Sequence, residues 1–430
     1  MNSPTGRSGP TGRSSSDVAA RVLRRFAPLS LVAALALSGG AHPQLSPPQS
    51  AHASMTRPWE HAIPSQDVPK GLSTLRASEC GECHAAIYRE WKATAHALAM
   101  QDRQFQAEWK KDNHLWLCLN CHTPLANQQE RLVDGLVDGD FRKPVAHPND
   151  HFDPMLRDEG ITCAVCHVRD GAVVGPGPGG EAPHPVSRAG DALSQKLCES
   201  CHNVQGQLSE TLICTFTTGD EWRANGMAAK NTGCIDCHMP PVLRPAADGA
   251  SLRPGHKHTW PGAGIAKRSD LVEPLSESYR PGYDVEIEAR RASGNRGQNE
   301  VVIDAAIANA RAGHELPTGD PERYITIEIV LRDRSGQSVW RREERIGEVW
   351  EWFPVARQVS DNSLKPGERR EFHYAVSLPG NGLDSLTVEV VARNHRMTVQ
   401  NAQAMAVFGI YPLHVATVRR SIRVSEPRRR

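Results

Sequence analysis

The C-terminal part of the chain alternates hydrophobic and polar residues in five short runs. Apolar side chains recur at every second position within each run, which is the pattern of a strand with one buried face. The runs are Tyr283–Ile287, Val301–Ile307, Ile325–Leu331, Phe372–Leu378 and Leu386–Val390. Turn-forming residues separate them, as at Asp333–Gly336 and Pro379–Gly382. We therefore expect an antiparallel, sandwich-like β domain over residues 266–430.

The region before this domain has a different pattern. In residues 84–100, four apolar residues from Ile87 to Leu98 recur at helical spacing and predict an amphipathic helix. The rest of residues 71–265 offers short helical stretches joined by loops, of which 171–185 is rich in glycine and proline. The predicted fold class is α+β, with a mainly helical and loop domain over 71–265 followed by the all-β domain.

The first 41 residues have the features of a secretory signal. Three arginines precede an apolar run from Phe26 to Leu37, and small residues follow it. The run is too short to cross a membrane, and nowhere does the chain approach the roughly 20 apolar residues of a spanning helix. We expect a signal peptide over 1–41, export to the periplasm or the cell exterior, and a protein that is not integral to the membrane. Residues 42–70 are rich in Pro, Ser, Ala and His and predict a disordered linker.

Charge and composition narrow the function classes. The 430-residue chain has a formal net charge of +1; residues 1–41 contain five arginines and one aspartate, so their removal would change it to −3. This balance argues against a nucleic-acid-binding protein, which would normally have a basic face. Aromatic residues make up 5% of the chain, which is few for a protein of this size. We therefore expect that a group other than side chains fills part of the core.

Ten of the 11 cysteines form five pairs with the pattern Cys-x-x-Cys-His, called motifs 1 to 5 below. In chain order they are Cys80, Cys83 and His84; Cys118, Cys121 and His122; Cys163, Cys166 and His167; Cys198, Cys201 and His202; and Cys234, Cys237 and His238. The pattern attaches c-type haem through two thioethers, and its histidine becomes the proximal iron ligand. Zinc ribbons or disulfides are the alternatives, but zinc does not require a histidine after every pair. The sequence predicts five covalent haem c groups.

The eleventh cysteine, Cys214, lies between motifs 4 and 5. A buried free thiol and an intermolecular disulfide both stay open as interpretations.

The second axial ligands decide what the haems can do, because an iron closed by two protein ligands only transfers electrons. Along a straight helix His84 and His96 would lie about 18 Å apart. Two axial nitrogens on one iron lie about 4 Å apart, so we expect His96 to close a neighbouring haem instead. His184 in the Gly/Pro loop, His258 before Trp-Pro-Gly, and His147 beside a turn are further candidates. For each, a solvated surface histidine is the alternative.

The segment Cys80–Ala97, in which C-x-x-C-H is followed by Ile-Tyr-x-x-Trp-x-x-x-x-His-Ala, resembles the opening of the cytochrome c-554 family of multihaem cytochromes. Glu159–His167 and the closing Cys-Ile-Asp-Cys-His-Met-Pro also resemble this family, so the likeness spans about residues 75–262. The resemblance implies that His96 ligates another haem. Residues 309–319 resemble a segment of β domains appended to multihaem cytochromes, which implies His314 as a ligand that reaches across from the β domain.

Two function classes follow, and no catalytic residue is assigned in either. In the first, five haems relay electrons between redox partner proteins, and ten haem propionates make the mature protein acidic enough to favour a partner with a basic patch. In the second, one open haem makes the protein an oxidoreductase for a small nitrogen or sulfur compound, although the C-x-x-C-K motif of pentahaem nitrite reductases is absent. Assembly through the β domain is compatible with both. We favour electron transfer.

Overall fold

The computed structural model describes residues 55–177, 182–227, 230–272, 279–293, 299–378, 385–410 and 412–425, and the backbone of His52–Ala53. All of them belong to one contact unit that runs from Ser50 to Arg430. The predicted signal peptide and the first part of the predicted linker lie outside the described residues.

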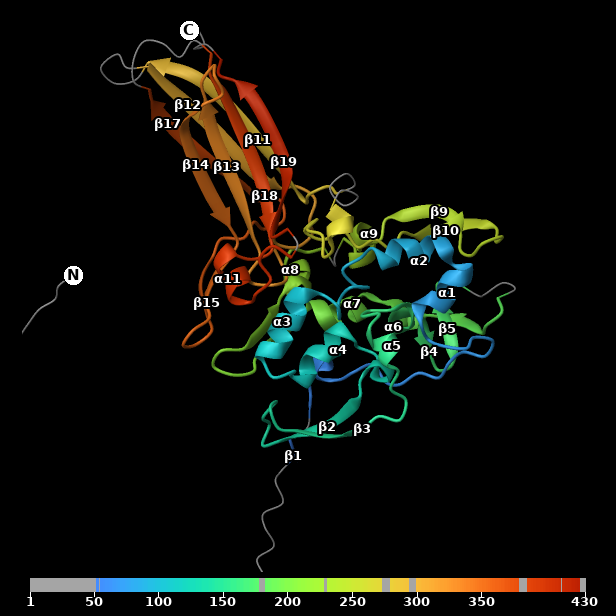
Figure 1. The fold of residues 1–430 in the computed structure, drawn as a ribbon. Coiled ribbons are helices and arrows are strands. Elements are labelled where there is room, and N and C mark those ends of the chain that lie inside the picture. The colour runs from blue at the N-terminus through green and yellow to red at the C-terminus, as the bar shows by residue number, and fades with distance from the viewer. Residues whose placement is uncertain are drawn as a thin grey trace, which may run out of the picture. The chain divides into compact units, whose positions relative to one another are not determined.

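Two antiparallel sheets form the C-terminal part of this unit (Figure 1). One sheet has the order β11-β12-β17, with bounds Tyr283–Ser293, Asn299–Asn309 and Arg369–Ser377. The other has the order β14-β13-β18-β19, with bounds Ser338–Ile346, Tyr324–Arg332, Thr387–His395 and His414–Arg423. A short hairpin, β15 (Glu348–Glu351) with β16 (Arg357–Asp361), and helix α11 (Val399–Ala404) complete this part. The five alternating runs are thus confirmed as strands.

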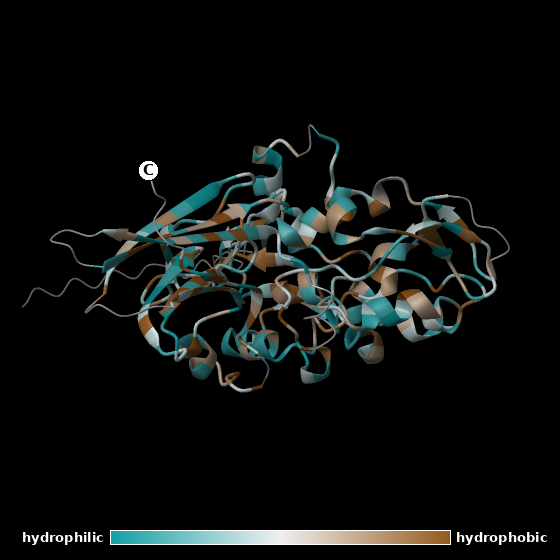
Figure 2. Ribbon diagram, turned by 90° about the horizontal axis from the view of Figure 1, so that it is seen from above, coloured by the Kyte–Doolittle hydropathy of each residue, from teal (hydrophilic) through white to brown (hydrophobic). Residues whose placement is uncertain are grey.

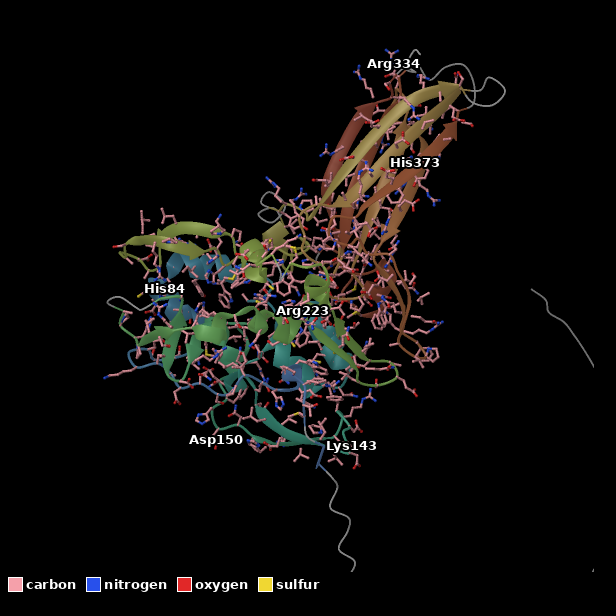
Figure 3. All side chains as sticks on the ribbon, turned by 180° about the vertical axis from the view of Figure 1, so that it is seen from behind. His84, Lys143, Asp150, Arg223, Arg334 and His373 are labelled. Carbon is pink, nitrogen blue, oxygen red and sulfur yellow. The ribbon has the colours of Figure 1, made fainter. Side chains whose placement is uncertain are left out.

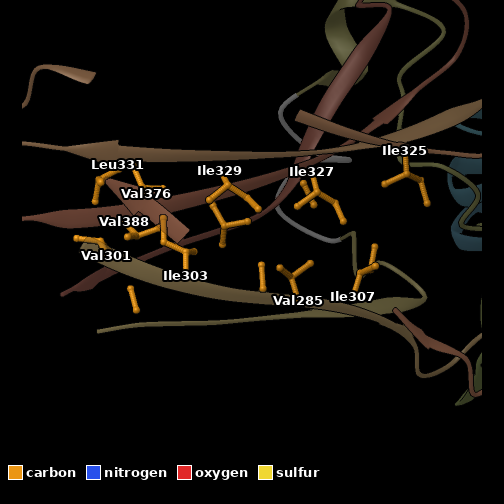
Figure 4. Close-up of a cluster of buried hydrophobic side chains, with 14 of the residues drawn as sticks. Val285, Val301, Ile303, Ile307, Ile325, Ile327, Ile329, Leu331, Val376 and Val388 are labelled. Atoms are coloured by element: carbon orange, nitrogen blue, oxygen red, sulfur yellow. The ribbon is translucent and has the colours of Figure 1, made fainter. Parts of the chain in front are cut away.

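The apolar faces of the two sheets pack against each other in one core (Figure 4). Val285 and Ile303 from the first sheet meet Ile327, Ile329 and Val388 from the second. The register places Ile327 opposite Ala392, so residues of the same face are neighbours across the strands. Burial of these β-branched side chains on one face, with polar residues on the other, is what makes two sheets associate as a sandwich.

The cysteine motifs lie in a region of short helices and small sheets that precedes the sandwich. The helices are α1 (Ala77–Cys83), α2 (Ala85–Lys92), α3 (Arg103–Lys111), α4 (Leu119–His122), α5 (Pro154–Arg157), α6 (Cys163–His167), α7 (Gln195–His202), α8 (Thr218–Ala224) and α9 (Cys234–His238), with 3₁₀ turns at Pro58–Glu60, Trp116–Cys118, Ala126–Gln128, Gly190–Leu193 and Ser269–Leu271. Apolar and polar residues are interspersed along these elements as well as along the strands (Figure 2). Because these helices occur together with the strands of the small sheets and of the sandwich, the protein is a mixed α+β protein.

Four small sheets connect these helices. They are β1-β2-β3 (His52–Ala53, Arg131–Val137, Pro144–Pro148), β4-β5-β6 (Val168–Arg169, Ala172–Gly175, Val186–Arg188), β7-β8 (Val204–Gln207, Ile213–Phe216) and β9-β10 (Pro241–Pro245, Leu252–His256). Among the residues described, none of the helices combines the length and the apolar character needed to cross a bilayer.

The helix expected over residues 84–100 is shorter than predicted. Helix α2 ends at Lys92, and turns continue to Gln101. The hydroxyl of Thr94 donates to the carbonyl oxygen of Trp91 at 2.7 Å and accepts from the backbone N–H of Ala97 at 3.3 Å, so a side chain replaces the helical pairing. The apolar periodicity persists in the sequence because the turns still bury Leu98 and its neighbours.

The predicted disordered linker also requires correction from residue 55 onwards. Trp59 is 7% exposed and packs with Leu115, Leu117 and Val204 in a small core. The backbone of Ile63 is bonded to the segment around Leu125. This stretch is ordered by contacts with residues far along the chain, which composition alone does not reveal.

Substitution of Ile327, which is 0% exposed in the sandwich core, tests the packing. We expect Ile327→Ala to lower the free energy of unfolding by about 2–5 kcal/mol, because the cavity between the sheets cannot close completely. Val339→Ala, at a side chain that is 37% exposed, serves as the control and should change it by no more than about 0.5 kcal/mol. Urea unfolding followed by circular dichroism measures both, and equal effects would contradict the proposed core.

Candidate functional site

A large cavity of about 2360 Å³ runs through the motif region and reaches the adjoining end of the sandwich. Ordinary small-molecule pockets have volumes of roughly 300–1,000 Å³, so this one has room for much more than one such ligand. All five motif histidines and every motif cysteine except Cys118 line it. The apolar residues Ile87, Leu193 and Ile235 line it too. The cavity therefore fits several flat apolar groups attached at the motif cysteines.

Each motif histidine lies at the end of a short helix or just after it. Four of the five have Nδ1 within hydrogen-bond distance of a backbone carbonyl oxygen: His84 at Ala246 (2.6 Å), His122 at Ala99 (2.8 Å), His167 at Val174 (3.0 Å) and His238 at Pro261 (2.9 Å). A histidine that binds a metal through Nε2 commonly donates its other N–H in this way, which sets the ring orientation. These four rings are thus held with Nε2 available.

Three motif histidines face a second histidine across the cavity. The ring centroids are 6.2 Å apart for His202 and His96, 6.2 Å for His167 and His258, and 6.1 Å for His238 and His314. Two imidazoles on opposite sides of one iron have nitrogens about 4 Å apart and, with about 1 Å from each nitrogen to its ring centre, centroids about 6 Å apart. The three pairs have the spacing that an iron between them requires.

The backbone positions two of these partners further. Nδ1 of His258 lies 3.1 Å from the carbonyl oxygen of His256, and Nδ1 of His314 lies 2.8 Å from that of Glu315. His314 follows β12 in the sandwich, so the sandwich contributes a side chain to the cavity of the motif region. The turns after α2 bring the ring of His96 to that of His202 in motif 4. The role of His96 as an iron ligand stays a prediction.

Trp260 contacts two of the three partner histidines. Its ring meets His96 edge-on at 4.8 Å and His258 edge-on at 5.4 Å. The backbone of Trp260 has φ of 37°, an uncommon value for a bulky residue, and the contacts on both sides of the ring keep it there. One indole thereby holds the partner histidines of motifs 3 and 4 in place.

His84 and His122 have no second histidine opposite them among the described residues. The ring of Phe105 lies parallel to that of His122 with centroids 3.6 Å apart, on the face of the imidazole and not at its Nε2 edge. The candidate His184 lines the cavity, and its neighbour Pro183 packs against Gly71, whose φ of +93° and lack of a Cβ permit the contact. His184 makes no ring contact with His84, so its role stays a prediction.

The candidate His147 is not brought to the cavity. It lies on β3, is exposed, and its Nδ1 lies 2.8 Å from Oδ2 of Asp134. Because the β2-β3 hairpin pairs it with Leu132 at the surface, the structure does not support a ligand role for this histidine.

His84 lies among the helices of the motif region, whereas His373, which was not a candidate, lies on the sandwich (Figure 3).

The helices that carry the motifs show which motifs are neighbours. Helix α1 contacts α6, α4 contacts α7, and α7 contacts α9. In agreement with this, Cys163, Cys121 and Cys234 are the largest influences on the pKa of the thiols of Cys80, Cys201 and Cys198. These contacts join motif 1 to motif 3, motif 2 to motif 4, and motif 4 to motif 5. Motifs 3 and 4 are linked through Trp260. If each thiol carries a haem edge, the haems form one connected path with motif 4 at its branch point.

Burial keeps the cavity histidines neutral. Burial, followed by the charge of His202, lowers the pKa of His96 to about 3. Burial also lowers the pKa of His122, His202 and His258 to about 4, and that of His167, His238 and His314 below the usual value. Neutral imidazole is the form that binds metals, so these rings have a lone pair available near neutral pH.

The zinc and disulfide alternatives gain no support. Within the described part of the chain, no three His, Cys, Asp or Glu side chains are grouped so as to hold a metal ion, and the motif cysteines are free thiols. Burial raises the pKa of the Cys118 thiol to about 12, which disfavours the thiolate that zinc would need. The motif cysteines surround one large cavity instead of four-residue clusters, as attachment to haem requires.

The comparisons with known proteins agree with this geometry. The family described as "Cytochrome c554 and c-prime" matches residues 79–139. A penta-haem cytochrome c552 from Thermochromatium tepidum has a similar structure, with a TM-score of 0.58 and 17% sequence identity over 83% of this chain and 100% of that one. The chain has the fold of a multihaem c-type cytochrome.

Two other structures can be aligned with about a third of the chain. They are the C-terminal domain of Wzt (10% identity, 35% of this chain and 77% of that one, TM-score 0.19) and Spo0M, a sporulation control protein from Bacillus subtilis (12% identity, 34% and 50%, TM-score 0.14). These scores are too low to indicate a common fold. Among curated proteins, no sequence matches this chain.

Sequence reasoning missed the backbone carbonyl oxygens that orient the motif histidines, and it missed Trp260 as a contact of His96. Carbonyl groups leave no sequence signal, because every residue has one. The run His256-Lys-His-Thr-Trp260 did leave a signal, since it places an aromatic ring two residues after His258. Its contact with His96, 164 residues earlier, depends on the tertiary structure alone.

Replacement of His96 tests the pairing with motif 4. We expect His96→Ala to remove one low-spin haem signal from the electron paramagnetic resonance (EPR) spectrum, because the iron at His202 loses its second ligand. The same signal should change in His202→Met and persist in His84→Met. His147→Ala is the matched surface control and should leave every signal unchanged. Loss of the signal assigned to His84 would show that the pairing is wrong.

Proposed function

We propose that this protein is an exported electron-transfer cytochrome that relays electrons through five covalently bound haem c groups. The observation that carries the proposal is the set of three histidine pairs at 6.1–6.2 Å across one cavity lined by all five motifs. The two cysteines of each motif would form the thioethers, and His84, His122, His167, His202 and His238 would be the proximal iron ligands. Haem supplies the one-electron chemistry, and the chain controls its ligands and surroundings.

The proposed distal ligands are His258 for motif 3, His96 for motif 4 and His314 for motif 5. Two histidines on each iron leave no position for a substrate, which suits electron transfer. His184 is the proposed ligand for motif 1, since it lies on a loop of the same cavity. Ligation by His314 would make the sandwich part of the electron path and explain why it adjoins the motif region.

The contacts between motifs support a branched relay. Motifs 1, 3 and 4 follow one another through the contact of α1 with α6 and through Trp260, and motifs 2 and 5 both adjoin motif 4 through the contacts of α7 with α4 and α9. Electrons that enter at motif 1 would therefore pass through motif 4 before they leave at motif 2 or at motif 5. The donor and the acceptor would be redox proteins outside the cytoplasm, because haem c is attached there and residues 1–41 have the features of a signal peptide.

One observation favours the second function at motif 2. Phe105 stacks on His122, and no described histidine lies opposite this ring. The side chains of Gln104 and Glu108 line the cavity here, and burial together with the charge of Asp320 raises the pKa of Glu108 to about 8. A haem with one protein ligand beside polar groups would bind a small nitrogen or sulfur compound. The protein would then combine a relay with one open haem.

The test is an EPR spectrum of the ferric holoprotein, integrated against haem content from a pyridine haemochrome assay. We expect five haems per chain, with at least three of them low-spin, because motifs 3, 4 and 5 have histidine on both sides. Fewer than five haems, or three or more high-spin irons, would contradict the relay. Nitrite, hydroxylamine and sulfite are then added in turn; a high-spin signal that changes on addition, and that is absent in His122→Met, identifies the open haem.

A further inference from the structure

A group of buried charges lies where the sandwich adjoins the cavity. Lys267 and Arg396 both face the carboxylate of Asp102, which is 3% exposed: Lys267 forms an ion pair with it, and Nη1 of Arg396 lies 3.5 Å from its Oδ1. Arg323 belongs to the same group and also lines the cavity. The carboxylate of Asp102 thus balances part of the charge of its two cationic neighbours.

Arg323 is different from the other two cations. Among the described residues its guanidinium makes one hydrogen bond, from Nη1 to the carbonyl oxygen of Thr318 at 3.4 Å, and it forms no ion pair. The carboxylate of Asp320, which has the largest electrostatic effect on Arg323, accepts instead from the backbone N–H of Glu322 at 3.0 Å and from Nε2 of Gln104 at 3.4 Å. A half-buried guanidinium with a single long hydrogen bond is costly unless an anion completes its surroundings.

The fold holds Arg323 in this position. The residue directly precedes β13, and its backbone N–H donates to the carbonyl oxygen of Asp320 in a tight turn. The next residue, Tyr324, stacks on His395 of β18 with ring centroids 4.2 Å apart. Arg323 is therefore attached to the rigid end of the sandwich and presented to the cavity, not carried on a mobile loop.

Hydrogen bonds connect Arg323 to motif 4. The hydroxyl of Thr318, whose carbonyl oxygen accepts from Arg323, is bonded to Thr218 and Glu221 of α8. Helix α8 is bonded in turn, through Asp220, to Asn203, the residue after His202. A haem c group brings two propionate carboxylates, and a guanidinium binds a carboxylate through two parallel N–H groups. A propionate carboxylate in the cavity would form the ion pair with Arg323 that the described carboxylates do not form.

We propose that Arg323 pairs with a propionate of the motif 4 haem and so raises the reduction potential of that haem. The inference rests on the proposed haem binding. A fixed positive charge beside the haem favours the reduced iron, which carries one positive charge fewer than the oxidised iron. The sandwich would then contribute to two haems: a ligand, His314, to motif 5 and a counter-charge, Arg323, to the branch point of the relay. A free anion that enters the cavity from solution is the other source of the same chemistry.

The test compares Arg323→Gln, Arg323→Lys and the control Arg334→Gln, all as holoprotein. Arg334 lies on the sandwich away from the cavity lining (Figure 3). An EPR-monitored redox titration gives the potential of each low-spin haem, and resonance Raman spectra follow the propionate bending band. In Arg323→Gln we expect the ratio of reduced to oxidised iron at one haem to fall about tenfold at a fixed potential, equivalent to about 59 mV. That haem should be the one whose signal His96→Ala removes.

The lysine variant, a free anion in the cavity and a failure of haem binding each give a different result in these measurements. Arg323→Lys should keep most of the potential but lose the propionate band of the wild type, because lysine retains the charge without the two-pronged geometry. Unchanged potentials and bands in both variants, with five haems present, would overturn the pairing. A wild-type potential that depends on added sulfate or nitrite, with the dependence lost in Arg323→Gln, would assign Arg323 to a free anion and also overturn it. Absence of haem from the wild type would instead refute the proposed function. If Arg323→Gln takes up no haem, the propionate bending band of Arg323→Lys is the deciding measurement, and a band unchanged from that of the wild type would overturn the pairing.

Discussion

The spacing of the facing imidazole rings across the cavity, which the proposed haem binding would require, is the constraint on which the rest of this structure depends. Two nitrogens must face each other about 4 Å apart, and side chains hold that geometry only when the backbone on both sides is anchored. The carbonyl oxygens that meet Nδ1 of His167, His238, His258 and His314 provide the anchors. The short helices and small sheets of the motif region can be understood as the scaffold that brings these carbonyl groups to the cavity.

Under the proposed function, the same constraint would give the sandwich a role beyond that of an appended domain. Its core is filled by buried side chains from both sheets, many of them β-branched. His314 and Arg323 extend from the end that adjoins the cavity. A ligand and a counter-charge held on a rigid element would keep their distance to the haems during oxidation and reduction. This need for fixed positions gives a physical reason for joining a β-sandwich to a multihaem region in one unit.

The proximity of the motifs follows from the size of the cavity. Haems that share one cavity would lie close to one another, and the contacts of α1 with α6, α4 with α7 and α7 with α9 mark where they would meet. Motif 4 takes part in two of these contacts and shares Trp260 with motif 3. A substitution near motif 4 therefore influences more of the proposed path than one at motif 1. The relay and an open haem at motif 2 are compatible, because motif 2 adjoins this branch point.

The sequence by itself determined the features that depend on local chemistry. Cys-x-x-Cys-His specifies the attachment of haem within five residues, and alternation with a period of two specifies the strands of the sandwich, because both act over a few neighbouring positions. The helix over 84–100 and the linker over 42–70 were predicted less well, since Thr94 and Trp59 make contacts that periodicity and composition do not register. Only the tertiary structure decided which histidines face each other. His96 and His202 are 106 residues apart in the sequence, and His238 and His314 come from different parts of the fold. A pairing across such distances depends on how the whole chain packs around the cavity, and no local pattern encodes it.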